Sequence, residues 1–323
     1  ATQLAVRNMK MSKLTKLNRH VIDHDQHRRE QVAKRKPMNA KRDPTDRNYE
    51  PGSVFVMDIF TFPGRDQVKL IAGRTGGKPP TAMIHAWDDS GSDFGYAKEV
   101  ATHTVGDLVD FIAHVQVSET NLGHTIKRVK MDRAPEVDCD ELKRRVETEL
   151  GIKLFIAPSG EHAGVHRAEA HMDPLSRASE AMLQRAKGNL PGDLRQYAAL
   201  ARKYANWISD RRPPTKGAPT RLQKHCGRIP DFDDKKGMTP LVFGCKVVRL
   251  KDENERIGWK GIGNRAITGI FVGIEHTSYM VYNPTTRKVT KEPYVWAIDE
   301  LEIARGGLAA GAMKHDAEVQ CDI

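Results

Sequence analysis

The sequence predicts a mixed α/β domain followed by a small all-β domain, on three observations. From residue 52 onward, short apolar runs alternate with segments whose apolar residues recur every three or four positions, which is typical of strands alternating with helices. From Thr239 to Glu302, short strand-like runs are separated by turns at 261–264 and 283–286, which favours a small β-barrel. The length of 323 residues also exceeds the usual size of one domain.

The α/β region contains five expected strands, near residues 54–60, 81–87, 94–100, 125–131 and 153–157. A helix after the third strand and another after the fourth carry apolar stripes that predict core-facing sides: Val105, Leu108, Val109, Ile112 and Val115, then Leu142, Val146 and Leu150. Farther on, Asp173 and Pro174 are a favourable N-cap and first helical residue, so we expect a helix from there to about Gly188. Another helix is expected from Gly192 to Asp210.

The remaining segments are rich in charge and poor in apolar periodicity. Residues 1–50 predict a basic helix and a flexible arm, residues 211–239 a basic linker rich in Pro and Gly, and residues 303–323 a flexible tail. The α/β core therefore extends over 51–210 and the small β-barrel over 240–302. The first residue is Ala1 rather than Met, which fits a piece of a longer polyprotein.

The composition favours a polyanionic partner. Lys and Arg total 52 against 42 Asp and Glu, which gives a formal charge of +10 and a pI near 9.4. No apolar run approaches the length of a membrane span and the N-terminus lacks a signal-peptide core, so we expect an intracellular protein without membrane contact. The four widely separated cysteines predict free thiols. His20, His24 and His27 have no cysteine pair beside them, so no zinc site is predicted there.

Three acidic residues stand in contexts that suit a metal site. Asp58 lies in the first expected strand, Asp132 ends the fourth, and Glu169 precedes a helical segment. Magnesium prefers hard oxygen ligands, and enzymes acting on phosphodiesters offer it a few carboxylates. Each acid alone is more often a solvated side chain, so the combination carries the prediction.

These residues lie in a pattern that resembles the integrase of copia-type long-terminal-repeat retrotransposons over roughly residues 50–302. The acidic triad of that family has about thirty-five residues between its second and third members, and 36 separate Asp132 from Glu169 here. Other similar stretches are Ile84 to Ser90 with its paired Asp88 and Asp89, Gly151-Ile152, Leu175, Ala181 to Leu183, Trp207, Arg211-Arg212-Pro213, Leu241 to Cys245, Gly269 to Gly273 and Tyr279 to Pro284.

The resemblance implies a ribonuclease-H-like mixed sheet with flanking helices, which gathers the acids at one edge. It implies an enzyme, a DNA strand transferase that processes DNA 3′ ends and inserts element DNA into a target. Asp58 would bridge two Mg²⁺ or Mn²⁺ ions, and Asp132 and Glu169 would each hold one. Element and target DNA, a homo-oligomer, and a nuclear location after a cytoplasmic stage are further expectations from the family.

Two departures from the family pattern leave alternatives open. First, Arg133-Ala134-Pro135-Glu136 stands where the family has Asn-Gly-Gly-Glu after its second aspartate. Second, the family has Gln-Asn-Gly-Val before its glutamate, and aligning Gly164-Val165 with that Gly-Val would place Arg167 at the third catalytic position. We prefer Glu169 because the following helix is then in register, although a helix beginning at Asp173 would leave Glu169 in a loop. The main alternative is a catalytically inactive or domesticated integrase-fold protein that binds nucleic acid or serves as a structural component; a ribonuclease of the same fold class is another.

Several side chains are candidates for other roles. We expect phosphate contacts from basic residues in the arm, the core, the linker and the barrel: Lys34, Arg35, Lys36, Arg133, Arg167, Lys235, Lys236, Lys246 and Arg249. Asp88 and Asp89 are interpreted as turn residues, and His166 and His171 as exposed loop histidines.

Overall fold

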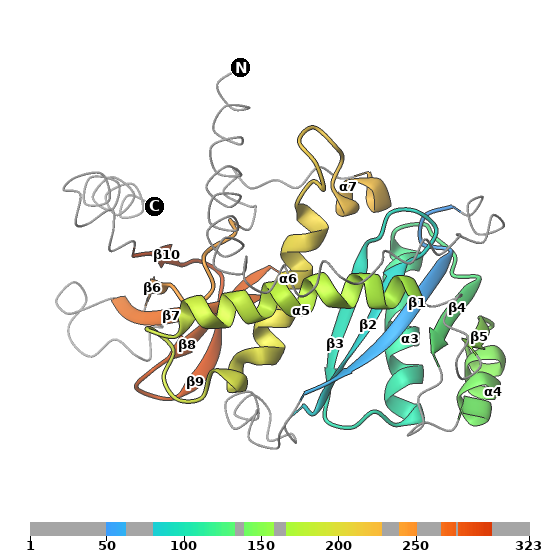
Figure 1. Ribbon diagram of the computed structural model, residues 1–323, viewed down its shortest axis with the longest axis horizontal. Helices are drawn as coiled ribbons and strands as arrows, with labels where there is room; N and C mark the ends of the chain where they lie inside the picture. Colours follow the sequence, from blue (N-terminus) through green and yellow to red (C-terminus); the bar gives the residue numbers. More distant parts are fainter. Residues whose placement is uncertain are drawn as a thin grey trace, which may run out of the picture.

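Two five-stranded sheets joined by long helices make up the computed structural model (Figure 1), which describes residues 50–62, 80–132, 139–157, 166–227, 239–250, 266–275 and 277–298. The first sheet has the order β3-β2-β1-β4-β5. Its strands are β1 (Val54–Thr61), β2 (Ala82–Asp88), β3 (Gly95–Val100), β4 (Arg128–Asp132) and β5 (Lys153–Ala157). All five lie within a few residues of the predicted strands.

The pairing of these strands confirms the predicted ribonuclease-H-like sheet. Strand β2 pairs antiparallel with both β1 and β3, whereas β4 pairs parallel with β1 and with β5. The ladders place Met57 opposite Met131 and Asp58 opposite His85. The centre of the sheet is thus β1, with antiparallel neighbours on one side and parallel neighbours on the other.

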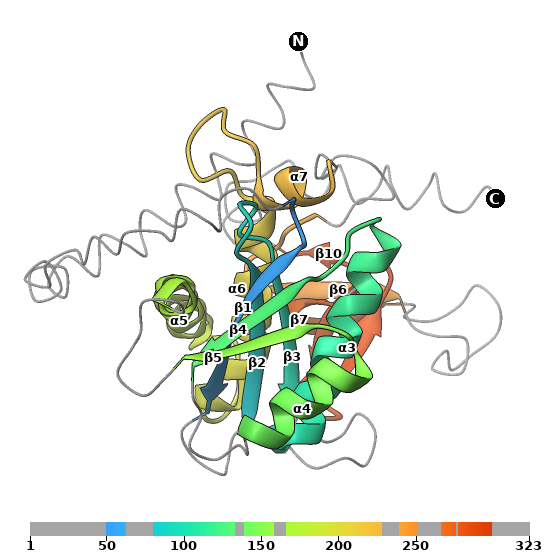
Figure 2. The same ribbon diagram turned by 90° about the vertical axis from the view of Figure 1, so that its right-hand side faces the viewer.

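Helices cover both faces of this sheet, as Figure 2 shows with α5 on one side and α3 and α4 on the other. The two covered faces follow from strand alternation, since successive side chains point to opposite faces. Phe55 and Met57 pack with the apolar stripes of α3 (Val105–Asn121) and α4 (Cys139–Glu149). Val56 lies in the opposite core, with residues of α5 (His166–Ala186) and α6 (Ala198–Arg211).

The start of α5 differs from the prediction. The helix begins at His166 rather than at Asp173, and Pro174 lies inside it. Proline removes one helical hydrogen bond, but burial of Ala168 and Leu175 against the sheet holds the turns on both sides of it. Glu169 therefore lies in the first turn of a helix and not in a loop. The next predicted helix is divided into a short 3₁₀ turn, η4 (Leu194–Tyr197), and α6.

The second sheet is antiparallel throughout and has the order β10-β6-β7-β8-β9. Its strands are β6 (Lys246–Leu250), β7 (Ala266–Glu275), β8 (Ser278–Asn283), β9 (Lys288–Glu292) and β10 (Trp296–Ala297). Although β6 and β9 are not neighbours, Arg249 Nε lies 3.3 Å from a Glu292 oxygen, so the sheet curls. Pairing between β9 and β10 is absent from the described ladders, and closure into a barrel stays a prediction.

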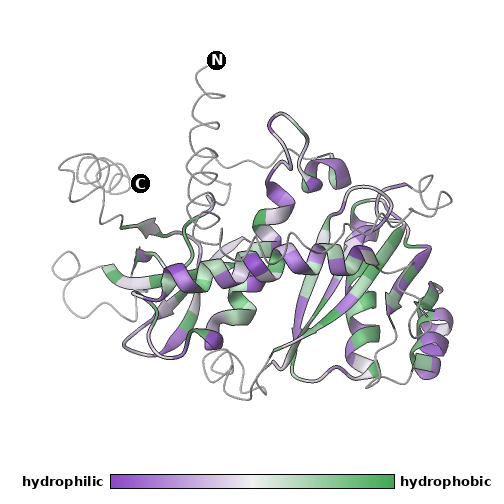
Figure 3. Ribbon diagram, viewed as in Figure 1, coloured by the Kyte–Doolittle hydropathy of each residue, from purple (hydrophilic) through white to green (hydrophobic). Residues whose placement is uncertain are grey.

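Helix α6 connects the two sheets through one apolar core. Leu200 and Tyr204 of α6 lie in a buried cluster with Met83 of β2 and Phe271 of β7. The Tyr204 hydroxyl donates to the Leu241 carbonyl oxygen at 2.6 Å. Figure 3 shows the amphipathic colouring of α5, which lies beside this core. The predicted boundary at residue 210 thus falls where packing is continuous.

Short helix α7 (Arg221–Cys226) lies inside the predicted linker 211–239. The predicted arm 1–50 and tail 303–323 lie outside the described residues, apart from Glu50. Among the helices that the structure describes, none is long and apolar enough to cross a membrane.

Candidate active site

Asp58 and Asp132 lie side by side on β1 and β4, two neighbouring interior strands of the first sheet. Because β1 and β4 are parallel with Met57 opposite Met131, the next position on each strand carries an aspartate. Asp58 is on the same face as Val56, two residues earlier, and this is the face that α5 covers. The two carboxylates therefore belong to neighbouring strands under one helix.

Glu169 completes this group from the first turn of α5, where its side chain is exposed. Burial raises the pKa of Asp58, and the negative charges of Glu169 and Asp132 raise it further, to about 6. The backbone N–H of Ile59, which donates to Asp58 Oδ1 at 2.8 Å, and the charge of Arg202 offset only part of that rise. The structure thus brings the three predicted acids close enough to repel one another, and we name them the acidic triad.

Arg167 points to a different place from Glu169. Its guanidinium donates to the Asp89 carbonyl oxygen at 2.8 Å, to the Asp89 carboxylate, and to Asp93 Oδ1 at 2.8 Å. Side chains two positions apart on a helix point about 200° away from each other, so Arg167 and Glu169 face opposite sides of α5. Arg167 thus fastens the helix to the turn after β2, and its charge is neutralised within the fold. This geometry favours Glu169 over Arg167 as the third member of the triad.

Arg202 of α6 is a residue of this site that the sequence did not reveal. Its side chain is only 1% exposed and its guanidinium carbon lies 3.8 Å from the ring centre of Phe60. Nε donates to His85 Nε2 at 3.0 Å, Nη1 donates to Ser176 Oγ at 2.8 Å, and Nη2 lies 2.9 Å from Met172 Sδ. One side chain therefore joins α6, α5, β1 and β2 beneath the triad.

In the described part of the chain, the positive charge of Arg202 is compensated by the more distant Asp58 and not by a direct salt bridge. Burial lowers the pKa of Arg202 to about 10, and the charge of Asp58 raises it, so the group stays protonated at neutral pH. Within the described residues no carboxylate lies within salt-bridge distance of it. Burial and Arg202 hold the pKa of His85 well below its usual value, so His85 is neutral and accepts the Arg202 hydrogen bond. Sequence offered one signal, an arginine with Ala198 and Ala205 on the same helical face.

Aromatic stacking extends from His85 toward the start of α5. The His85 ring is stacked on Trp87 at 5.1 Å, and Trp87 is stacked on His171 at 5.3 Å. His171 Nε2 also lies 3.4 Å from Asp93 Oδ1. The prediction of an exposed loop histidine at 171 is therefore wrong, because α5 begins earlier than expected and packs this ring against the sheet. His166 is the first residue of the same helix.

Asp88 is the last residue of β2, and Asp89 begins the turn that follows it, as predicted for Asp89. Asp88 accepts hydrogen bonds from the backbone N–H groups of Ser90 at 3.0 Å and Ser92 at 3.2 Å. Burial raises its pKa, but hydrogen bonds from His225, Ser90 and Ser92 lower it to about 2. Asp89 pairs with Lys130 at 3.1 Å and with Arg167. Both acids are thus paired inside the fold.

The predicted phosphate contacts have different outcomes. Arg249 is buried, 3% exposed, and paired with Glu292, so the structure does not support its role at a surface. Lys246 is exposed on β6. The other basic candidates lie outside the described residues: Lys34, Arg35, Lys36, Arg133, Lys235 and Lys236.

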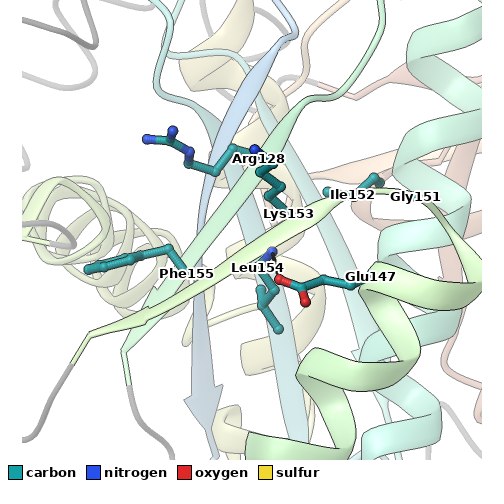
Figure 4. A pocket seen from close by; sticks show the side chains of 7 residues that line it. All are labelled: Arg128, Glu147, Gly151, Ile152, Lys153, Leu154 and Phe155. Atoms are coloured by element: carbon teal, nitrogen blue, oxygen red, sulfur yellow. Dashed lines mark hydrogen bonds between the residues drawn. The ribbon is translucent and has the colours of Figure 1, made fainter.

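A shallow pocket lies at the other end of the parallel strands. Figure 4 shows its lining, which comes from the starts of β4 and β5 and from α4: Arg128, Glu147, Gly151, Ile152, Lys153, Leu154 and Phe155. Arg128 begins β4 and pairs with Lys153, whereas Asp132 ends β4 and pairs with Ala157. The pocket is therefore separate from the acidic triad.

The triad has the donor set of a divalent cation site. Three carboxylates supply hard oxygen ligands, and burial together with the charges of Glu169 and Asp132 raises the pKa of Asp58. A strongly perturbed acid beside two others is a frequent feature of active sites.

Comparison with known proteins finds similarity to solved structures only. No family model and no curated protein matches the chain. It is similar to a chain of the simian T-cell lymphotropic virus intasome in complex with PP2A regulatory subunit B56 gamma, at 17% identity over 79% of this chain and 81% of that one, with a TM-score of 0.41. It is also similar to the HTLV-2 integrase catalytic core domain in complex with magnesium, at 15% identity over 55% and 97%, with a TM-score of 0.37. It is similar as well to the catalytic core domain of BIV integrase, at 13% identity over 54% of this chain and 93% of that one, with a TM-score of 0.35. The strand order and register described above establish the ribonuclease-H-like mixed sheet independently of these scores.

Proposed function

We propose that this chain is the integrase of a copia-type retrotransposon, which processes DNA 3′ ends and joins them to target DNA by metal-dependent transesterification. The observation that carries the proposal is the convergence of Asp58, Asp132 and Glu169 on one face of the sheet, with the pKa of Asp58 raised to about 6. The copia-type pattern in the sequence and the formal charge of +10 support it.

In this proposal the three carboxylates hold divalent ions, Mg²⁺ or Mn²⁺, which when bound activate the attacking oxygen and stabilise the leaving one. The chain supplies orientation. Ile59 N–H fixes one oxygen of Asp58, β4 fixes Asp132, and the Arg167 contacts of α5 fix the helical turn that carries Glu169. Arg202 limits the repulsion beneath the triad and binds α5 to the sheet.

DNA, both element ends and target, is the proposed partner, and a homo-oligomer acting in the nucleus is part of the same proposal.

One observation favours a second candidate function. Arg133-Ala134-Pro135-Glu136 follows Asp132 where copia-type integrases have a glycine turn. A catalytically inactive integrase-fold protein that still binds nucleic acid would tolerate this change, and its affinity would fall with salt but not with triad substitution.

Strand transfer tests the proposal directly. Purified protein is incubated with labelled oligonucleotides that carry the element's terminal sequence, with Mg²⁺ or Mn²⁺, and joined products are counted. We expect products from the wild type and at least a hundredfold fewer from both Asp132→Asn and Glu169→Gln, because each removes a ligand charge. Asp173→Asn, an exposed acid one helical turn after Glu169, is the matched control and should keep full activity.

The possible outcomes separate the alternatives. Loss with Asp132→Asn alone would place the third ligand elsewhere than Glu169. Absence of products from the wild type, together with salt-sensitive DNA binding that Asp132→Asn does not change, would favour the inactive nucleic-acid-binding protein. Cleavage of the RNA strand in hybrids without joining would indicate a ribonuclease.

A further inference from the structure

A second cluster of ionisable side chains lies apart from the triad, where α7 meets the end of α3. Glu119 belongs to the last turns of α3, His124 follows that helix, and His225 belongs to α7. Glu119 Oε2 lies 2.8 Å from His124 Nδ1, and Glu119 Oε1 lies 2.9 Å from His225 Nε2. One donor atom from each of the three residues lies within 4.8 Å of the other two.

This cluster is closed off from solvent. The side chains of Glu119 and His225 are fully buried, and His124 is 20% exposed at the rim. The Tyr96 hydroxyl also donates to Glu119 Oε1, at 2.5 Å. Phe94 is stacked on the His225 ring at 4.6 Å, which fixes the plane of that ring. Both imidazoles therefore present defined nitrogen atoms to one carboxylate.

The charges around the cluster are compatible with a dication. Glu119 contacts both imidazoles, and Asp88 lies on the far side of His225. If His124 and His225 are neutral and a divalent ion lies between them, the charges of the ion, Glu119 and Asp88 sum to zero. A buried site without net charge is more stable than one with an uncompensated carboxylate.

His225 also has the support that metal-bound histidines receive. Its second ring nitrogen, Nδ1, lies 3.0 Å from Ser92 Oγ and 3.5 Å from Asp88 Oδ2. A carboxylate or hydroxyl on the far nitrogen fixes the tautomer that leaves the near nitrogen as a ligand. Asp88 is held in turn by the backbone N–H groups of Ser90 and Ser92.

Gly52 leaves space for this cluster at the entry to β1. A Cβ atom added there would lie 2.1 Å from Glu119 Oε2 and 2.5 Å from His124 Nδ1, and the backbone has φ of +79°. Any larger residue would therefore displace the two facing donor atoms. The chain thus passes directly over the cluster at residue 52 and returns to it at His225.

We propose that Glu119, His124 and His225 form a zinc site that fastens α7 to the catalytic core. The ligands are one carboxylate oxygen, His124 Nδ1 and His225 Nε2. Two imidazoles and one carboxylate suit zinc, whereas magnesium prefers oxygen alone. The two nitrogens contact different oxygens of Glu119, at 2.8 and 2.9 Å, and the three donor atoms lie within 4.8 Å of one another. The side chains must therefore shift to reach the spacing of about 3.3 Å between tetrahedral zinc ligands.

The position of this site gives it a structural role. Gly52 and Ser53 lead into β1, and His225 lies near the end of the helical segment before residues 228–238. Zinc would therefore join the points at which the chain enters and leaves the catalytic core. The ion would hold α7 against the end of α3 without contacting the acidic triad.

Metal content of the full chain tests this proposal. The protein is stripped with a chelator, dialysed against micromolar zinc and measured by mass spectrometry, and cobalt is added separately to record its visible absorption. We expect one zinc per chain, a cobalt spectrum typical of tetrahedral coordination, and an increase in Tm with zinc. His124→Ala, at the rim of the site, should lower zinc affinity at least tenfold and remove the cobalt bands.

Two controls keep the test specific. His114→Ala changes an exposed histidine of α3 and should leave the stoichiometry at one. Asp132→Asn should also leave it unchanged, since the triad is separate. Folded wild-type protein that binds no zinc at micromolar concentration, or equal zinc binding by His124→Ala and wild type, would overturn the proposal whether or not strand transfer occurs.

Discussion

Asp58 and Asp88 lie on neighbouring strands of one sheet, yet their pKa values move in opposite directions. Burial and two nearby carboxylates raise the pKa of Asp58 to about 6. Burial acts in the same sense on Asp88, but hydrogen bonds from His225, Ser90 and Ser92 lower its pKa to about 2. Burial acts in the same direction on both carboxylates, so the charged and hydrogen-bonding groups beside each one decide whether its pKa rises or falls.

The same contrast separates the two proposed cation sites. The acidic triad presents only oxygen atoms, with Glu169 exposed, and its neighbouring carboxylates raise the pKa of Asp58. The Glu119, His124 and His225 cluster presents two nitrogens and one carboxylate, almost fully buried, with hydrogen bonds already in place. We infer that the first selects a hard ion exchanged during catalysis and the second a tightly held structural ion.

The largest expected effect is that of Arg202→Ala. This change removes the buried group that joins α5, α6 and the sheet, and it leaves Asp58 without its nearby positive charge. We expect the free energy of unfolding to fall by about 3 kcal/mol, because the change leaves a cavity and removes the hydrogen bonds to His85 and Ser176. Denaturant unfolding followed by circular dichroism measures it. Arg145→Ala, which breaks only the exposed pair with Glu149, should be nearly neutral, and equal effects would contradict the role of Arg202.

His225→Gln tests the opposite pattern at the second cluster, in metal-free buffer. Burial lowers the pKa of His225, but Asp88 and Glu119 raise it to about 9. A raised histidine pKa stabilises the fold fully below about pH 6.5, and this contribution is lost as the pH rises through 9. The substitution should therefore reduce stability by roughly 3 kcal/mol at pH 6 and by much less at pH 10. A loss that is independent of pH would show that His225 acts through packing alone.

Gly52→Ala tests how tightly the chain at residue 52 packs against the Glu119 and His124 side chains. The added methyl group meets Glu119 and His124, and the positive φ adds backbone strain, so we expect a loss of about 2 kcal/mol. Gly123→Ala is the matched control, because its φ is +83° and its Cβ would have no neighbour within 4 Å. Thermal unfolding of both variants separates the two contributions. Equal changes in Tm would mean that the contact with the cluster has no energetic effect.

Much of the first sheet and two members of the triad followed from local sequence. Strands have a period of two and the apolar stripes of α3 and α4 have a helical period, so the strands that carry Asp58 and Asp132 were predictable, with Asp58 inside β1 and Asp132 at the end of β4. The start of α5 was not, because Asp173-Pro174 is a strong local start signal. The ion pairs of Arg167 with Asp89 and Asp93 and the burial of Ala168 outweigh that signal, and they are visible only in three dimensions.

Arg202 and the proposed zinc site were largely beyond sequence reasoning for a related reason. The contacts of Arg202 come from four elements, and none has a fixed spacing from residue 202. Glu119 and His124 are close in the sequence, but His225 reaches them only through α7, a helix inside a segment predicted to be a linker. Such groups form by folding and have no periodic pattern.

Magnesium-dependent stability of wild type and Asp58→Asn, measured between pH 4 and 8, tests the acidic triad most directly. The raised pKa of Asp58 means that ionisation destabilises the metal-free fold as the pH rises from about 4 through 6, at most by roughly 3 kcal/mol. With a chelator at pH 7.5, Asp58→Asn should therefore have the higher Tm, and magnesium should raise the Tm of the wild type alone. A wild type that gains no stability from magnesium, and that loses none relative to Asp58→Asn as the pH rises, would contradict a divalent cation site at the triad.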